Sequence, residues 1–227
     1  MSRESGHWLQ KMIPIEQIRS KIEGECFDYS QLMHVLSNYR KPRDSVSSLL
    51  KRGHIIRVRK GLYVFSPIWR RTTLALEPLA NLIYGPSAIS LDYALAWYGL
   101  IPERVTTITS TAAGRSRQFL TPVGNFSYTQ LSEKRFSVGL IRHSGPYGNF
   151  IMAEPLKALA DKVWTDSRFK PTSKASYTDY LFVDLRIDEA SLAPLIAADK
   201  AMTIEQAYAT RKVQWLMEYL LKRFKDA

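Results

Sequence analysis

The chain has 227 residues and a mass of 26.0 kDa, enough for one large domain or two modest ones with a real hydrophobic core. Hydrophobic residues make up 45% and charged residues 23%, which excludes a chain dominated by disorder. Lys and Arg total 32 against 21 Asp and Glu, so the net charge is +11, a surplus that favours acidic partners.

Membrane and disulfide-rich classes do not fit the sequence. No apolar run approaches the roughly 18 residues of a membrane span, and residues 1–10 lack the apolar stretch of a signal peptide. We therefore expect a cytoplasmic protein that does not enter a membrane. The single cysteine, Cys26, excludes an intramolecular disulfide and a multi-cysteine zinc site.

The positive charge is concentrated near the N-terminus. Residues 1–71 hold 14 Lys or Arg and 6 Asp or Glu, a net charge of +8, whereas the rest of the chain carries +3. Such a density is typical of a surface that binds a polyanion, and the alternative is a basic face that is only solvated. Between positions 40 and 60 one acid, Asp44, stands among eight bases: Arg40, Lys41, Arg43, Lys51, Arg52, Arg57, Arg59 and Lys60.

Two short helices are predicted before this basic stretch. Isoleucines at helical spacing after Pro14 predict a first helix over residues 14–22. Asp28 and Gln31 have the spacing of a capping box, and the apolar residues that follow predict a second helix to about residue 37.

A third helix and a hairpin carry the basic residues. The third helix is predicted from Pro42 to Arg52, with Val46, Leu49 and Leu50 facing inward. Two β-rich runs, 54–59 and 62–65, follow and are joined at Gly61, which can adopt the positive φ of a tight turn.

This order predicts a winged helix-turn-helix, in which the third helix enters the major groove of DNA and the hairpin follows the backbone. The alternative is a small α/β packing module with a solvated basic rim. Hydroxyls and long cations suit base edges and phosphates, so we expect DNA contacts from Arg40, Lys41, Arg43, Ser45, Ser47, Ser48, Lys51, Arg52, Arg57, Arg59 and Lys60.

The chain beyond position 70 is nearly neutral, and we place a domain boundary there. The sequence thus predicts an α+β protein with a winged helix-turn-helix over 1–70 and a mixed α/β domain over 71–227. In the second domain, helices are predicted at 77–83, 90–97, 153–164, 191–197 and 203–224, and strands at 105–110, 119–121, 124–130, 136–141 and 181–187. The last helix carries an apolar stripe typical of a core face.

Six short motifs occur in the order LKRG (50–53), IRVRKGLY (56–63), AISLDYAL (88–95), GLIP (99–102), TPVG (121–124) and AEPLKALAD (153–161). In this combination the chain resembles the AbiEi antitoxins of abortive-infection, type IV toxin–antitoxin systems. The resemblance implies an N-terminal winged-helix repressor that binds the double-stranded operator DNA of its own operon. It also implies a C-terminal domain that antagonises a cognate nucleotidyltransferase-like toxin.

The sequence offers few candidates for catalysis. The four histidines, His7, His34, His54 and His143, lie far apart and lack metal-ligand spacing. The stretch 145–148 contains two glycines but not the lysine of a P-loop, and we expect a turn there.

Glu154, Lys157 and Asp161 form the one cluster that suggests an enzyme, because carboxylates beside a lysine can hold magnesium in nucleases. On a helix they are neighbours at i, i+3 and i+4, and we expect a row of surface ion pairs. The glycine-serine and paired-aspartate signature of the toxin is absent from this sequence. We therefore expect no enzymatic activity, no cofactor and no metal.

The leading hypothesis is a DNA-binding antitoxin and autorepressor. The first alternative is a transcriptional regulator whose C-terminal domain senses a small ligand. The second is a metal-dependent nuclease that uses Glu154 and Asp161.

Overall fold

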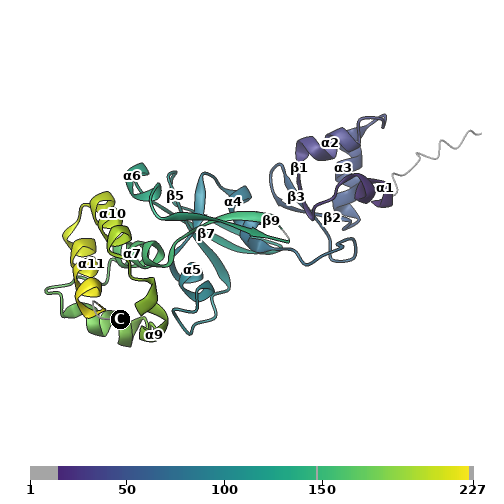
Figure 1. Ribbon diagram of the computed structural model, residues 1–227. Coiled ribbons are helices and arrows are strands. Elements are labelled where there is room, and N and C mark those ends of the chain that lie inside the picture. The colour runs from purple at the N-terminus through teal and green to yellow at the C-terminus, as the bar shows by residue number, and fades with distance from the viewer. Residues whose placement is uncertain (1–14, 147, 225–227) are drawn as a thin grey trace, which may run out of the picture. The chain divides into compact units, whose positions relative to one another are not determined.

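The computed structural model describes residues 15–146 and 148–224 (Figure 1). The chain divides into two compact units, Met1–Leu74 and Ala75–Ala227, whereas the sequence placed the boundary near residue 70. Both helices and sheets are present, so the protein belongs to the α+β class. Pro14 and His7, named above, lie outside the described residues.

The N-terminal unit follows the order helix, strand, helix, helix, hairpin. Its three strands form an antiparallel sheet with the order β1-β3-β2, so β3 lies in the middle. The predicted helices and hairpin are confirmed, and the three-residue strand β1 was not predicted because it is too short for a period-two pattern. The elements are α1 (Ile15–Lys21), β1 (Cys26–Asp28), α2 (Tyr29–Val35), α3 (Pro42–Lys51), β2 (Ile55–Arg59) and β3 (Leu62–Phe65).

The capping box predicted at the start of α2 is present. The Asp28 carboxylate accepts a hydrogen bond from the Gln31 backbone N–H at 2.7 Å, and the Gln31 side chain accepts one from the Asp28 N–H at 2.9 Å. These bonds satisfy donors that the first turn of a helix leaves free.

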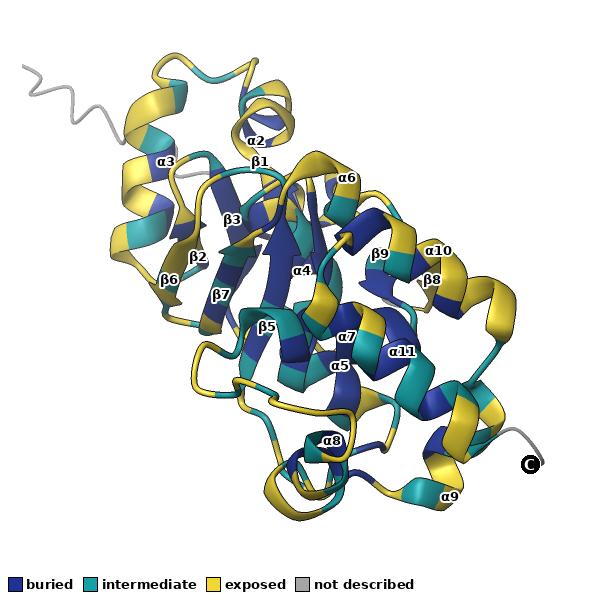
Figure 2. Cartoon of the chain, turned by 90° about the vertical axis from the view of Figure 1, so that its left-hand side faces the viewer, coloured by how far each residue is buried: buried dark blue, intermediate teal, exposed yellow. Residues whose placement is uncertain are grey.

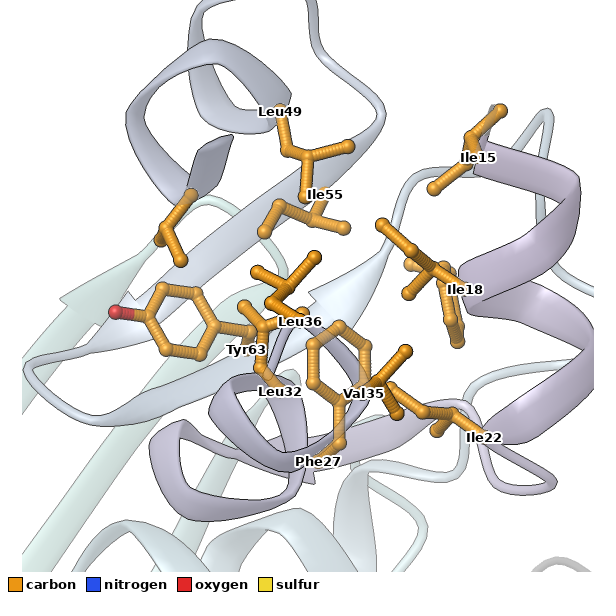
Figure 3. Packing of buried hydrophobic residues seen from close by; sticks show 12 residues of the cluster. Ile15, Ile18, Ile22, Phe27, Leu32, Val35, Leu36, Leu49, Ile55 and Tyr63 are labelled. Carbon is orange, nitrogen blue, oxygen red and sulfur yellow. The ribbon is translucent and has the colours of Figure 1, made fainter. Parts of the chain in front are cut away.

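One apolar cluster joins the three helices to the sheet (Figure 3). Ile18, Leu32 and Leu36 are completely buried, and the Phe27 ring packs on the Phe65 ring with centroids 4.7 Å apart. The cluster consists of Ile15, Ile18, Ile22, Phe27, Leu32, Val35, Leu36, Val46, Leu49, Ile55, Tyr63 and Phe65. Its size gives this unit a hydrophobic core of its own.

The C-terminal unit contains a mixed six-stranded sheet with the order β6-β7-β5-β4-β9-β8. Hairpins form both edges, while β5 runs parallel to β7 and β4 runs parallel to β9. The inner strands β4 and β9 were not predicted. The strands are β4 (Ser87–Ile89), β5 (Thr107–Ala112), β6 (Arg117–Thr121), β7 (Gly124–Gln130), β8 (Leu140–Gly145) and β9 (Gly148–Ala153).

Two helices cover opposite faces of the sheet at β5 and β7. The Tyr128 hydroxyl donates to the Ala80 carbonyl of α4 (Leu76–Ile83), whereas the Thr109 hydroxyl accepts from the Tyr93 N–H of α5 (Leu91–Trp97). Tyr128 is paired with Ser110, the neighbour of Thr109, and adjacent residues of a strand point to opposite faces.

The remaining long helices pack together beside the sheet (Figure 1). They are α7 (Pro155–Thr165), α10 (Ala198–Tyr208) and α11 (Arg211–Arg223). The predicted core stripe of the last helix is confirmed over α11 by the buried residues Val213, Leu216, Met217 and Leu220. Short helical segments complete the unit: α6 (Glu133–Phe136), α8 (Ser176–Asp179) and α9 (Glu189–Leu192).

Several predicted elements of this unit are wrong. The expected strand 181–187 does not form: its first four residues belong to a π-helical segment, Tyr180–Asp184, and 185–187 have no regular structure. The expected strand 136–141 begins only at Leu140 because α6 precedes it. The expected helix 203–224 is two helices, since Ala209 adopts the left-handed conformation with φ 48° and ends α10. The expected helix 191–197 is α9 followed by a 3-10 turn, Ala193–Leu195.

Candidate nucleic-acid interface

Helix α3 has one buried side and one basic, exposed side. Pro42 at its first turn suits the fixed φ of a helix start. Val46 and Leu49 are buried in the N-terminal core, while Leu50 is only half-buried. Figure 2 shows the outer side of α3 coloured largely as exposed.

All eleven predicted DNA-contacting residues lie on α3, directly before or after it, or on the hairpin β2–β3. Ten of them are exposed and one, Ser45, is half-buried. Because Val46 and Leu49 anchor the same helix in the core, the cations are held on a folded surface rather than on a loose tail. The exposed ten are Arg40, Lys41, Arg43, Ser47, Ser48, Lys51, Arg52, Arg57, Arg59 and Lys60.

Asp44, the acid on α3, neutralises little of the positive charge of this surface. Lys41 Nζ lies 3.9 Å from Asp44 Oδ2, and the two side chains are 63% and 70% exposed. An exposed pair at that distance contributes at most about 1 kcal/mol and yields readily to a phosphate.

Two hydroxyls of α3 already use their protons within the helix. Ser45 Oγ donates to the Lys41 carbonyl at 3.1 Å, and Ser47 Oγ donates to the Arg43 carbonyl at 3.3 Å. In these rotamers each oxygen can only accept a further hydrogen bond. Such an oxygen matches a base amino group better than a phosphate.

A shift in the pairing of the hairpin strands leaves two arginines, Arg57 and Arg59, exposed. The pairing of β2 with β3 shifts between Arg57 and Arg59, as in a β-bulge. Ile55 and Val58 are therefore both buried, and both arginines are exposed. Gly61, with φ 85°, closes the turn after Lys60 in a conformation that side chains disfavour.

Not every cation of the N-terminal unit belongs to this surface. Arg19 is 4% exposed, and its guanidinium donates to the Ile22 and Trp69 carbonyls at 2.6 and 3.0 Å and to Glu25 Oε1 at 2.7 Å. Burial lowers the pKa of Arg19, while Glu25 opposes that decrease. Glu25 Oε1 also accepts from the Thr72 N–H at 3.1 Å. Arg19 and Glu25 therefore connect the last residues of the N-terminal unit, near Thr72, to the loop between α1 and β1.

The prediction of surface ion pairs on the second candidate cluster is wrong. Lys157 and Asp161 are completely buried, with Nζ 2.5 Å from Oδ1. The Ser90 hydroxyl donates to Asp161 Oδ2 at 2.6 Å, and the Tyr208 hydroxyl donates to Oδ1. Burial lowers the pKa of Lys157, and Asp161 opposes that decrease. Burial, followed by the Asp161 charge, raises the pKa of Tyr208, so the phenol remains a donor.

Glu154 takes no part in this buried group. It pairs with Lys200 of α10, and the two side chains are 20% and 50% exposed. The two carboxylates of the nuclease alternative thus have different partners. A signal for the burial was present in the sequence, since Leu and Ala occupy positions 156 and 158–160 beside Lys157 and Asp161, and such an apolar stretch of helix favours burial.

The described histidines and the cysteine also lie in separate surroundings. His54 Nδ1 accepts a hydrogen bond from Trp69 Nε1 at 3.0 Å, and His143 stacks on Phe150. Burial raises the pKa of the Cys26 thiol to about 12. Among the residues that the structure describes, no three His, Cys, Asp or Glu are grouped to hold a metal ion.

Comparison with protein-family models finds no match for this chain, and comparison with curated protein sequences finds none either. Within 15–146 and 148–224, none of the helices combines the length and the apolar character needed to cross a bilayer.

Proposed function

We propose that this chain binds double-stranded DNA through a winged helix in its N-terminal unit. The observation that carries the proposal is the segregation on α3 and the hairpin: apolar side chains enter the core, and ten of eleven predicted contact residues are exposed. The element order α1-β1-α2-α3-β2-β3 supports it, because a winged helix requires a third helix followed directly by a β-hairpin.

The two parts of the surface have different roles in this proposal. Helix α3 enters the major groove, where Arg43, Ser47 and Lys51 meet base edges and the nearest phosphates. Arg57 and Arg59 on the hairpin follow the phosphate backbone and supply affinity without sequence preference.

The proposal extends to an autorepressor and antitoxin without catalytic activity. The support for the antitoxin role is the resemblance of the ordered motifs to the AbiEi antitoxins. The C-terminal unit is the part proposed to antagonise the nucleotidyltransferase-like toxin. Its separate core supports a division of labour in which DNA binding and antitoxicity can be lost independently.

The DNA proposal is tested by fluorescence anisotropy with a duplex from upstream of the gene. If about five phosphates are contacted per protomer, log affinity should fall against log salt with a slope of roughly −4 to −5. Substituting Ala for Arg43, Lys51 and Arg52 together should abolish specific binding without unfolding the chain.

The matched control removes three exposed cations from the C-terminal unit, Arg115, Lys134 and Lys170, and should retain most of the affinity. A slope near zero, or equal losses in both triple variants, would contradict a localised DNA surface.

The antitoxin proposal is tested in cells that express the cognate toxin from an independent promoter. The α3 triple variant should derepress a reporter of its own promoter and still rescue the cells. If a folded triple variant fails to rescue at constant toxin dosage, antitoxicity depends on the DNA-binding surface and the division of labour is wrong.

A further inference from the structure

The C-terminal sheet ends at the strand β6. Within the part of the chain that the structure describes, β6 pairs with β7 alone, at one end of the strand order β6-β7-β5-β4-β9-β8. An edge strand presents backbone N–H and C=O groups without sheet partners, and another strand can add to it. Natural edge strands are often protected by a lysine, a proline or a bulge. The strand Arg117–Thr121 contains neither Lys nor Pro, and its register with β7 has no shift.

The pairing with β7 decides which backbone groups of β6 point to the edge. Thr121 and Gly124 are partners across a two-residue turn, so they form the first hydrogen-bonded pair of the ladder. Hydrogen-bonded and non-hydrogen-bonded pairs alternate along an antiparallel ladder. The N–H and C=O groups of Gln118 and Leu120 therefore point away from β7.

These outward groups are complementary to their own copy. In an antiparallel pair of two β6 strands with a two-fold axis at Phe119, Gln118 of each copy lies opposite Leu120 of the other. Two residues opposed in this way exchange both of their N–H···O=C hydrogen bonds. The axis generates this pair twice, so both outward-pointing residues of each copy find backbone partners.

Other registers of the same two strands form fewer backbone bonds. A slip of one residue would oppose the outward groups to groups that are already bonded to β7. An axis at Leu120 would place Gln118 opposite Pro122, which has no N–H. An axis at Gln118 would require Ser116, which lies outside the strand. The pairing centred on Phe119 is the one that uses residues of β6 alone.

The side chains favour this register on both faces of the sheet. Leu120 is 83% exposed, and in the pair it would be the diagonal neighbour of Leu120 in the second copy. On the other face the two Phe119 rings would lie directly opposite each other. Phe119 already packs against Tyr84 and Tyr128, with ring centroids 6.1 and 5.7 Å away, so the pair would continue this aromatic cluster across the axis.

The charge of β6 does not oppose the pairing. Arg117 is its one charged residue, and it would lie opposite Thr121 of the second copy. The two Arg117 residues would be four positions apart along the strands, about 14 Å at about 3.4 Å per residue. This separation exceeds the Debye length of about 8 Å at physiological salt, so their repulsion is screened.

We propose that β6 is a self-association surface, on which two copies of this chain pair their β6 strands about a two-fold axis at Phe119. Each copy uses its β6 edge in the contact, so the assembly closes at a dimer. One short strand pair lies at the low end of interface areas, and we expect a reversible dimer with a Kd on the order of 1–100 μM. The proposal concerns the C-terminal unit and does not rest on DNA binding.

The test is sedimentation of the full-length chain from about 5 to about 500 μM, a range that brackets the expected Kd. The weight-average mass should rise from that of the 26.0 kDa chain towards twice that value. Leu120→Lys and Leu120→Glu should each weaken dimerisation by about tenfold or more, because like charges then become neighbours across the axis. An equimolar mixture of the two variants should dimerise more tightly than either alone, because Lys then faces Glu.

A second variant tests the backbone bonds. Gln118→Pro removes an N–H that points away from β7, so the chain should fold while the dimer weakens. Met202→Lys is the matched control for the charge substitutions, because Met202 is 56% exposed on α10, and it should leave dimerisation unchanged. Circular dichroism checks the fold of each variant, and if Gln118→Pro is destabilised the mixture of the Leu120 variants decides.

Four outcomes would overturn the proposal. The first is a monomer throughout the concentration range, and the second is growth beyond a dimer. The third is dimerisation that survives the Leu120 substitutions or is lost equally in Met202→Lys, since the contact would then lie elsewhere. The fourth is a mixture of the Lys and Glu variants that associates no better than each variant alone, because the two Leu120 positions would then not be neighbours.

Discussion

Replacing Asp161 by Asn should destabilise the C-terminal unit by about 3–5 kcal/mol at pH 7. The carboxylate is the counterion of Lys157, and both side chains are completely buried. The Ser90 and Tyr208 hydroxyls donate to different oxygens of Asp161. Asn keeps one acceptor oxygen and the volume of the side chain, so the substitution removes the charge and one of these two hydrogen bonds. Breaking a buried ion pair on one side has a cost of this size, because the remaining charge has no water and no opposite charge beside it.

The upper end of this range follows from the proton that Lys157 can release. Its ordinary pKa is 10.5, and burial already lowers it in the folded chain. Deprotonation at pH 7 costs about 1.36 kcal/mol per unit over about 3.5 units, or about 5 kcal/mol. The folded variant then holds one proton fewer than the unfolded variant, so its stability rises with pH. The loss relative to wild type should shrink to about 2 kcal/mol at pH 9.

The assay is urea unfolding followed by circular dichroism at pH 7 and pH 9. Adding Lys157→Met to Asp161→Asn should recover part of the loss, because no charge is then left buried. Glu154→Gln is the control: it breaks a partly exposed pair with Lys200 and should cost no more than about 1 kcal/mol at either pH. A loss below 1 kcal/mol at pH 7, or one that does not change with pH, would refute the reasoning.

Three further predictions concern other positions. Arg19→Ala should lower the stability of the N-terminal unit by about 3 kcal/mol in thermal unfolding, because it leaves the Glu25 carboxylate without its counterion and the Ile22 and Trp69 carbonyls without the guanidinium donor. Ala209→Gly should raise the stability by about 1 kcal/mol, since φ 48° strains any residue with a Cβ, and an unchanged melting temperature would contradict this. The hydrogen bond from Arg168 lowers the pKa of Asp166 from 3.8 to about 2. The stability that the ionised Asp166 contributes is therefore complete above about pH 4 and is lost as the pH falls towards about 2. In Asp166→Asn the melting temperature should depend less on pH over that interval than in the wild type.

The elements that the sequence predicted well depend on residues close together in the chain. The capping box of Asp28 and Gln31, the helix from Pro42 and the turn at Gly61 each arise from contacts within a few residues. Exposure of the basic residues on α3 was equally predictable, because a charged side chain opposite Val46 and Leu49 has nowhere to lie except in water.

Elements whose form depends on distant contacts were not predicted well. The largely apolar stretch 181–187 suits a short strand or a buried helix by periodicity alone, and packing in the C-terminal unit makes its first part, 181–184, helical. The inner strand β4 has three residues, and only its partners β5 and β9, which come later in the chain, make it a strand.

By itself the sequence determined where the positive charge is concentrated, which local segments form helices and the hairpin of the N-terminal unit, and that Lys157 and Asp161 are neighbours on one helix. Only the tertiary structure decided that this pair is buried rather than exposed, and that β6 lies at an edge of the C-terminal sheet with Leu120 exposed. The reason is physical: spacing along a helix is the same in water and in the core. Whether two charges are solvated depends on which distant segments pack over them, here Ser90 at the start of α5 and Tyr208 from α10.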